Sequence, residues 1–191
     1  MIYIIRHGQT ALNNAQVLQG RSNHPLNEVG ILQARRAGAC FKAQDIRFDT
    51  VYSSPLLRAV QTAELIAEDS AIVTDVRLLE MDYGPYEGMD LRNPVPELLA
   101  FFKDFVHTPA PQGKEPLSSV VARAGAFMEE LREHSHTNLL ISTHAIAMKG
   151  ILEYLTPASE GSYWSKYIGN CAVYKTEFIS GHFTVPTEIE I

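Results

Sequence analysis

The sequence predicts an α/β domain with a mainly parallel central sheet. Short apolar segments alternate along the chain with longer segments in which apolar residues recur every three or four positions. Strands that alternate with helices in this way favour a parallel sheet covered by helices. The chain has 191 residues, 46% of them hydrophobic and 20% charged, so it can form a core of its own. Because no internal repeat or linker is visible, we expect one domain over residues 1–191.

The first half of the chain contains three strand candidates, a long loop and two helices. The strand candidates are residues 2–5, 49–52 and 71–74. Residues 8–27 are polar and contain glycine, asparagine and proline, so we expect them to form the loop. A helix is expected to start after Asn27, a favourable N-cap residue, and to run to about residue 43. The second helix is expected to begin at Pro55, because proline is favoured at the first helical position, and to continue to Ile66.

The second half repeats the alternation and ends in a hairpin. The expected elements are helices over residues 98–106, 118–133 and 145–155, a buried strand over residues 138–142, and loops over residues 80–96 and 108–115. Near the end of the chain, residues 172–178 and 182–185 alternate in character on either side of Ser180-Gly181, which predicts a terminal hairpin.

The composition excludes several classes of partner. The 16 Lys and Arg residues are outnumbered by 22 Asp and Glu residues, which gives a net charge of -6. Nucleic-acid binding needs a basic surface, so we expect no nucleic-acid partner. The apolar N-terminus is too short for a signal sequence, and no apolar run approaches the ~20 residues that span a bilayer. We therefore expect a cytoplasmic protein with no membrane partner.

Unusual residues follow three of the expected strands. Arg6 and His7 come directly after the first strand, and Arg58 lies in the first helical turn after the second. His144 follows the strand that precedes the last helix. In an open α/β sheet the carboxyl ends of the strands form the ligand site, and the adjacent helix N-termini attract anions. Taken singly, each histidine could be a buried core residue and Arg58 a solvated helix residue. Together they predict a phosphate site.

The ordered motifs resemble those of the histidine phosphatase superfamily, whose founding members are cofactor-dependent phosphoglycerate mutases. The matching segments are residues 6–13 (RHGQTALN), 19–20 (QG), 25–30 (PLNEVG), 33–34 (QA), 52–63 (YSSPLLRAVQTA), 79–88 (LEMDYGPYEG), 142–144 (STH) and 170–173 (NCAV). The resemblance implies a three-layer α/β/α sandwich with a small cap formed by insertions. It also implies that the substrate is a small phosphorylated molecule and that neither a metal ion nor another cofactor is needed.

The same resemblance assigns roles to individual residues. His7 would be the nucleophile that carries the phosphoryl group, and Glu80 would protonate the leaving oxygen. The phosphate pocket would consist of Arg6, Asn13, Gln19, Gly20, Arg58, His144 and Ala145. Histidine attacks phosphorus only as the neutral imidazole, and the adjacent arginines disfavour its protonation. Glu80 must begin protonated, and a bound phosphate dianion would favour that state.

The sequence departs from the family pattern at several positions. Ala145 stands where glycine commonly follows the second histidine, although its backbone N–H remains available to an anion. Gln9 replaces a frequent glutamate, and Leu12 replaces an aromatic residue. Residues 112–116 resemble the family's Gly-Gly-Glu-Ser turn only loosely. Since this turn lies near the substrate pocket in the family, the sequence predicts no particular substrate.

The expected cap favours hydrolysis over transfer to a second hydroxyl. The cap is placed at roughly residues 81–117, and its basic residues are Arg92, Lys103 and Lys114. A cap with so few basic residues fits an organic leaving group better than a second phosphate or a carboxylate. We therefore expect a phosphomonoesterase. Two alternatives remain, namely a cofactor-dependent phosphoglycerate mutase and a non-catalytic phosphate-binding module.

Two other clusters are expected to have structural roles. His134 and His136 alternate near a helix end and are expected at the solvated surface, because a metal site would need further ligands. Phe101, Phe102 and Phe105 are expected to pack in the core or line the cap. A platform for stacking nucleic-acid bases would carry more basic residues among the aromatic ones.

Overall fold

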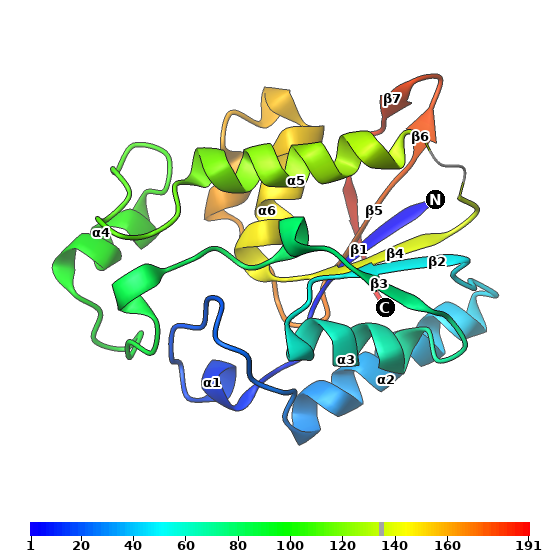
Figure 1. The fold of residues 1–191 in the computed structure, drawn as a ribbon, viewed down its shortest axis with the longest axis horizontal. Helices are drawn as coiled ribbons and strands as arrows, with labels where there is room; N and C mark the ends of the chain where they lie inside the picture. The colour runs from blue at the N-terminus through cyan, green and yellow to red at the C-terminus, as the bar shows by residue number, and fades with distance from the viewer. Residues whose placement is uncertain (134–135) are drawn as a thin grey trace.

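The computed structural model describes residues 1–133 and 136–191, and these residues form an α/β fold around one six-stranded sheet (Figure 1). The strand order is β3-β2-β4-β1-β5-β8. The strands are β1 (Ile2–Arg6), β2 (Thr50–Ser53), β3 (Ile72–Thr74), β4 (Leu139–Thr143), β5 (Val173–Thr176) and β8 (Thr187–Ile189). The four strands β3, β2, β4 and β1 are parallel, whereas β5 is antiparallel to both β1 and β8. The predicted mainly parallel sheet is confirmed.

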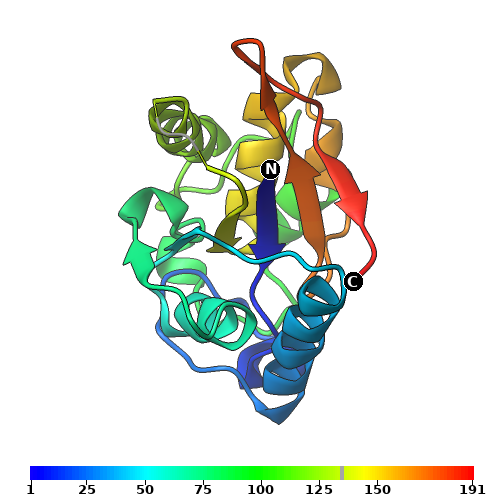
Figure 2. The ribbon, with the colours of Figure 1, turned by 90° about the vertical axis from the view of Figure 1, so that its right-hand side faces the viewer.

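Helices cover both faces of the sheet, as predicted for a three-layer sandwich (Figures 1 and 2). Helices α2 (Glu28–Ala43) and α3 (Leu57–Ile66) pack on one face, and α5 (Leu117–Leu131) and α6 (Ala145–Leu155) pack on the other. Residues of β1 alternate between the two cores: Ile2 and Ile4 face α5 and α6, whereas Tyr3 and Ile5 face α2 and α3. Burying each such side chain stabilises the fold by about 1.5–3 kcal/mol, so the register of this strand is strongly specified.

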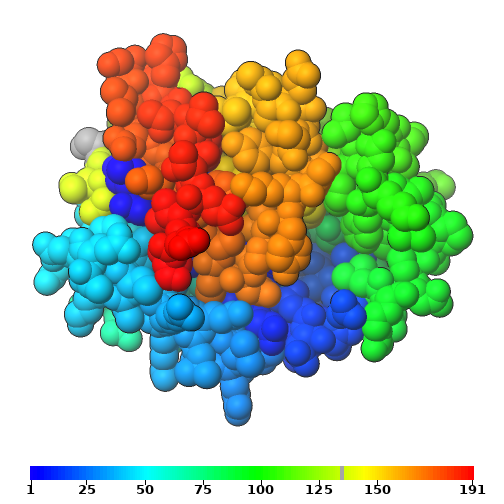
Figure 3. Space-filling model, turned by 180° about the vertical axis from the view of Figure 1, so that it is seen from behind, coloured from blue at the N-terminus to red at the C-terminus, as the bar shows by residue number. Residues whose placement is uncertain are grey.

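A lobe beside the sandwich contains the short helix α4 (Pro96–Lys103), and Figure 3 shows it as the green bulge next to the C-terminal half of the chain. Its core joins Met81, Tyr83 and Leu98 to Trp164. Phe101 packs edge-on against Phe105, with 4.7 Å between the ring centroids. The phenylalanine cluster therefore fills the lobe core, as expected.

Several helix boundaries differ from the prediction because polar side chains cap the helices, one from a distant part of the chain and two from adjacent residues. The expected second helix begins at Leu57 instead of Pro55, because the Leu57 N–H donates to Asn23 Oδ1 at 2.7 Å. The expected long loop contains a short helix, α1 (Ala11–Asn14), whose N-terminus is capped by Thr10. Helix α4 ends before Asp104, whose carboxylate accepts the N–H groups of two residues that follow it.

Helix α2 begins where the sequence predicts, because Asn27 Oδ1 accepts the Gly30 N–H at 2.8 Å. Among the described residues there are four 3₁₀ helices. η2 (Gly84–Tyr86) lies in the loop expected over residues 80–96, whereas no element was predicted for the segments of η1 (Val76–Leu78), η3 (Pro157–Ser159) and η4 (Ser162–Ser165).

The C-terminal hairpin is shorter than predicted. Strands β6 (Phe178–Ile179) and β7 (His182–Phe183) pair around Ser180 and Gly181, which both have positive φ as in a tight hairpin turn. Residues 173–176, which were expected to belong to the hairpin, pair with β1 in the main sheet instead. Strand β8 was not predicted, because its residues are mostly exposed and lack a clear pattern.

One of the two histidines expected at the surface belongs to the described residues. His134 is outside the described residues, whereas His136 is half-buried and its Nδ1 lies 3.1 Å from Thr50 Oγ1. Within residues 1–133 and 136–191, no group of three or more His, Cys, Asp or Glu side chains is placed to hold a metal ion. In the same part of the chain, no helix is both long enough and apolar enough to cross a bilayer.

Candidate active site

Four side chains that the sequence singled out meet at the carboxyl edge of the sheet. His7 follows β1, Arg58 is the second residue of α3, and His144 links β4 to α6. Their exposed fractions are 4%, 0% and 0%, and that of Glu80 is 5%. Arg58 Nε lies 3.2 Å from both His7 Nε2 and His144 Nδ1. The parallel topology thus brings residues 137 positions apart into one buried polar cluster.

The His7 imidazole is held in one orientation by its own loop. Its Nδ1 lies 2.7 Å from the Gly8 carbonyl oxygen, so Nδ1 carries the proton and donates it there. Nε2 then keeps its lone pair and faces Arg58. Burial, followed by the charges of Arg58 and Arg6, holds the pKa of His7 well below its usual value. The neutral state was expected from the arginines alone, but burial is the largest cause.

Gly8 allows this loop to pack tightly against helix α2. A Cβ atom at Gly8 would lie 2.5 Å from the Gly30 carbonyl oxygen, which is closer than packing permits. The Gly8 N–H donates to Thr62 Oγ1 at 3.0 Å, and the Thr62 hydroxyl donates to the Arg58 carbonyl at 2.7 Å. Thr62, which the sequence argument did not single out, therefore ties the loop after β1 to helix α3.

Arg58 is also bound to the loop that precedes helix α2. Its guanidinium donates to the carbonyl oxygens of Gly20 (2.7 Å) and Ser22 (2.8 Å). With the Gln19 amide oriented to satisfy its neighbours, its oxygen accepts from Arg58 Nε at 2.8 Å and its nitrogen donates to Thr10 Oγ1 at 2.7 Å. Burial lowers the pKa of Arg58 to about 10, so it stays charged at neutral pH.

Gly20 is restricted by a close approach of the lobe. A Cβ atom there would lie 2.2 Å from Glu87 Oε1 and 2.9 Å from the Met81 carbonyl oxygen. The Glu87 carboxylate accepts the N–H groups of Arg21 and Ser22, the latter at 3.0 Å. The loop that carries Gln19 and Gly20 is therefore fixed between the lobe and Arg58.

His144 is the second buried imidazole of the site. Its Nε2 lies 2.8 Å from Ser54 Oγ, while Nδ1 accepts from Arg58 Nε. Burial and then the charge of Arg58 hold the pKa of His144 well below its usual value, so this ring is neutral. Ala145 is the first residue of α6, and its N–H therefore has no carbonyl partner within the helix.

Arg6 and Asn13 both contact the segment that precedes β5. Arg6 NH1 donates to the Ile168 carbonyl at 2.5 Å, while its buried Nε has no partner among the described residues. Asn13 Oδ1 accepts from Asn170 Nδ2 at 3.3 Å, and the same Nδ2 lies 3.0 Å from the His7 carbonyl oxygen. The structure thus connects Asn13 to the histidine loop through Asn170.

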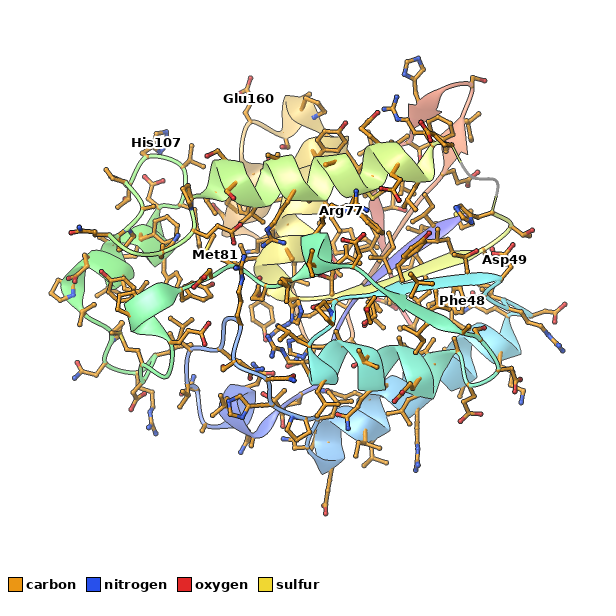
Figure 4. All side chains as sticks on the ribbon, in the orientation of Figure 1. Phe48, Asp49, Arg77, Met81, His107 and Glu160 are labelled. Atoms are coloured by element: carbon orange, nitrogen blue, oxygen red, sulfur yellow. The ribbon has the colours of Figure 1, made fainter. Side chains whose placement is uncertain are left out.

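The Glu80 carboxylate is bound at the N-terminus of helix α6. Oε1 accepts the N–H groups of Ala147 (3.0 Å) and Met81 (2.8 Å), and Oε2 accepts that of Ile146 (3.2 Å). Figure 4 shows Met81 between the sandwich and the lobe. Glu80 therefore lies where the lobe meets the sheet edge that carries the two histidines.

Two buried lysines pack on the aromatic residues of the lobe. Lys114 Nζ lies 3.6 Å from the centroid of the Phe101 ring. Lys149, from helix α6, donates to the Trp164 carbonyl at 2.7 Å and lies 5.3 Å from the Phe105 centroid. Burial lowers the pKa of each lysine to about 8. Lys149 adds a cation that the count over residues 81–117 missed, so the region is less poor in basic groups than the sequence indicates.

An α/β sandwich with two buried histidines and two arginines at its carboxyl edge is the arrangement of an enzyme that handles anionic substrates. The sequence profile of the histidine phosphatase superfamily (branch 1) matches residues 2–188. The chain belongs to this superfamily. The resemblance seen in the motifs is therefore confirmed over nearly the whole chain.

Relatives of this chain include both phosphatases and mutases. Phosphoserine phosphatase 1 from Hydrogenobacter thermophilus is 28% identical over 170 residues, which cover 86% of this chain and 80% of the relative. A 2,3-bisphosphoglycerate-dependent phosphoglycerate mutase from Methylobacterium sp. (strain 4-46) is 33% identical over 169 residues, which cover 81% and 80% of the two chains. The expected class, a phosphoric monoester hydrolase, agrees with the family and with the first of these relatives.

The fold is also that of solved phosphatase structures. A mycobacterial glucosyl-3-phosphoglycerate phosphatase, solved in complex with VO3, superposes with a TM-score of 0.85 over 96% of both chains at 23% identity. At this identity the likeness supports the fold alone. It confirms the predicted α/β/α sandwich.

Proposed function

We propose that this protein hydrolyses phosphate monoesters of small metabolites through a phosphohistidine intermediate on His7. One observation carries the proposal: the Gly8 carbonyl fixes the proton on His7 Nδ1, so the lone pair of Nε2 is directed toward Arg58 at 3.2 Å. A neutral, oriented imidazole beside a charged guanidinium is the combination needed to attack a phosphate ester.

The reaction has two balanced steps. In the first, His7 Nε2 bonds to phosphorus, the bond to the leaving oxygen breaks, and Glu80 gives that oxygen its proton. In the second, water attacks the phosphoryl group, Glu80 takes up the proton of the water, and the bond to Nε2 breaks to release phosphate. Arg6 and Arg58 neutralise the charge that spreads over the phosphoryl oxygens.

The remaining predicted residues complete the phosphate pocket in this proposal. His144 joins the clamp, because a bound dianion favours the protonated ring and so opposes the effect of burial. Asn13, Gln19, the main chain at Gly20 and the N–H of Ala145 supply further polar groups around the phosphate. Loop 19–22 already contacts Arg58, so phosphate oxygens would take over hydrogen bonds that Gln19 makes in this structure.

We further propose that residues 81–117 act as a cap within a single domain over residues 1–191. The aromatic core of the lobe and the position of Glu80 at its base support this assignment. The substrate is a small phosphorylated molecule, which agrees with the substrate named for phosphoserine phosphatase 1. A cytoplasmic location, and the absence of nucleic-acid and membrane partners, stay predictions from composition.

Two assays separate the mutase and the non-catalytic module from the phosphatase. We expect phosphate release from p-nitrophenyl phosphate with undiminished rate in the presence of EDTA. With 3-phosphoglycerate and a catalytic amount of 2,3-bisphosphoglycerate, we expect phosphate release to exceed formation of 2-phosphoglycerate. Much faster isomerisation would identify a mutase, to which the relative from Methylobacterium points. No turnover on any phosphate ester would identify a binding module.

The role of Glu80 is tested by the leaving group. Glu80→Gln should lower kcat/KM for an alkyl phosphate by about 10²-fold or more, because an alkoxide needs a proton as it leaves. The loss on p-nitrophenyl phosphate should be much smaller, since nitrophenolate leaves without one. Both rates are measured on the same preparation, and the exposed Glu97→Gln variant in α4 serves as the control. Equal losses on the two esters would contradict general-acid catalysis by Glu80.

A further inference from the structure

The backbone that leads to Glu80 is irregular and is held by side chains. It leaves the 3₁₀ helix η1 and continues to η2 without joining the sheet. Thr143 Oγ1 donates to the Leu78 carbonyl at 2.8 Å. One nitrogen of Arg123, NH1, donates to the carbonyls of both Arg77 (2.7 Å) and Leu79 (2.6 Å). Carbonyls that are partly shielded from water need a donor, so Arg123 supplies the hydrogen bonds that a neighbouring strand would otherwise provide.

The partner of Arg123 holds the backbone on the other side of Glu80. Glu115 Oε2 accepts the Asp82 N–H at 3.1 Å, and the Glu115 N–H donates to the Asp82 carbonyl at 2.7 Å. Glu115 Oε1 and Arg123 Nε are 2.9 Å apart. The ion pair therefore binds the backbone on both sides of Glu80: Arg123 binds Leu79, which precedes it, and Glu115 binds Asp82, which follows it.

This pair is better shielded than the surface ion pairs of the chain. The Arg123 and Glu115 side chains are 15% and 8% exposed, whereas Arg92 and Asp90 in the lobe are 65% and 45% exposed. Burial alone would raise the pKa of Glu115, but hydrogen bonds from Arg123 and the Asp82 N–H keep it below its usual value. Glu115 is therefore charged at neutral pH. Removing Arg123 would leave this carboxylate with the half-exposed Arg21, 3.3 Å from Oε2, and with the Ser119 hydroxyl, 3.0 Å from Oε1.

Proton transfer requires the Glu80 carboxylate to lie within hydrogen-bond reach of the leaving oxygen, at about 2.6–3.2 Å. The Glu80 carboxylate is bound to α6, and the carbonyl of the preceding residue, Leu79, is bound to α5 through Arg123, while the Glu80 carbonyl itself lies 3.4 Å from Arg21 Nε. The position of Glu80 therefore depends on contacts from both α5 and α6. A misplacement of about 1 Å in a catalytic group can cost about 10²-fold in rate.

We propose that Arg123 and Glu115 are positioning residues that hold Glu80 in place for proton donation to the leaving group. The inference rests on the proposed role of Glu80 as general acid. The turn at Glu115, whose neighbours depart from the family pattern, would then affect catalysis through the position of Glu80.

The test compares Arg123→Gln and Glu115→Gln with the parent protein on two esters. We expect kcat/KM for glycerol 2-phosphate, an alkyl ester, to fall by about 10- to 100-fold, and that for p-nitrophenyl phosphate by less than about threefold. In a Glu80→Gln background, Arg123→Gln should cause no further loss on the alkyl ester beyond about twofold, because residues that act through one group are not additive. Arg123→Lys, which keeps the charge and one donor direction, should recover part of the loss.

Arg77→Gln is the matched control. Arg77 pairs with Asp75 (2.6 Å) and Glu130 (2.8 Å) and lies against α5, as Figure 4 shows. Its guanidinium donates to neither Leu79 nor Asp82, the residues that Arg123 and Glu115 bind beside Glu80. Its removal should leave the ratio of the two kcat/KM values unchanged. Thermal unfolding midpoints show whether each variant is folded. If Arg123→Gln does not fold, the positioning role is tested with Glu115→Gln, which keeps the shape of the side chain.

The outcomes separate this inference from the function on which it rests. Equal losses on both esters in Arg123→Gln and Glu115→Gln, with Glu80→Gln still selective for the alkyl ester, would overturn the positioning role and leave the phosphatase mechanism intact. A Glu80→Gln variant without selectivity would instead remove the general-acid assignment and the inference with it.

Discussion

His7→Ala should abolish turnover, with a loss on the order of 10⁴-fold or more, as removal of a nucleophile usually causes. The phosphohistidine path cannot proceed without Nε2, and none of the remaining groups of the site replaces it in the same position. Acid-quenched labelling of the wild type should reveal a phosphoryl adduct that is labile in acid and stable in base. The variant should show no adduct. Retention of more than a few per cent of the wild-type rate would show that the mechanism is wrong.

Comparison with the second histidine makes this prediction specific. His144→Ala removes the other buried imidazole of the same cluster, whose ring centroid is 5.2 Å from that of His7. It should slow turnover but still form the adduct on His7. His7 is 4% exposed, so its replacement can also lower stability, and the thermal midpoint of each variant must be measured as well.

The strands and helices that carry most of the buried surface could be predicted from their patterns. Strand β1 and strand β4 are apolar on both faces, which is the pattern of a central parallel strand. The start of α3 could not be predicted, because Asn23 caps it from 34 positions earlier in the chain. Strand β8 has little apolar character, and it forms because β5 offers it a free edge.

The sequence predicts those site residues whose positions follow from the sheet topology. His7, Arg58 and His144 each follow a strand, so their convergence needs only the parallel sheet. Ser54 and Asn170 were part of recognised motifs, but as ordinary polar residues they gave no sign of their contacts with His144 and His7. For Ser54, its place directly after β2 was a usable signal.

The contacts between the lobe and the sandwich could not be predicted from the sequence. Lys149 lies in the interior of α6, and the helical pattern gives no reason to place its ammonium against the lobe aromatics. Glu115 precedes α5 and Arg123 lies eight positions later within this helix, and their role depends on the path of the backbone that leads to Glu80. Such contacts are seen only in the tertiary structure, because they join separate segments and no sequence pattern links those segments.

Arg58→Ala should lower kcat/KM by about 10²–10³-fold, which is the usual cost of losing a preorganised group that stabilises transition-state charge. Arg58 is fully buried and contacts both histidines, so its charge acts in a setting with little solvent screening. The same side chain satisfies the Gly20 and Ser22 carbonyls, and each buried acceptor left without a donor costs about 1–3 kcal/mol. The free energy of unfolding, measured in urea, should therefore fall as well.

The two effects of Arg58 are separated by comparison with a conservative and a distant substitution. Arg58→Lys keeps the charge but cannot reach both loop carbonyls and both histidines, so its loss in kcat/KM should lie between those of the wild type and Arg58→Ala. Arg92→Ala removes an exposed arginine that pairs with Asp90 in the lobe, and it should change kcat/KM by less than about twofold. The assays are run well below the unfolding midpoint of each variant, so lost stability does not appear as lost activity. If folded Arg58→Ala lost less than about tenfold in kcat/KM, the guanidinium would not be the main stabiliser of the phosphoryl charge, and Arg6 would have to carry that role.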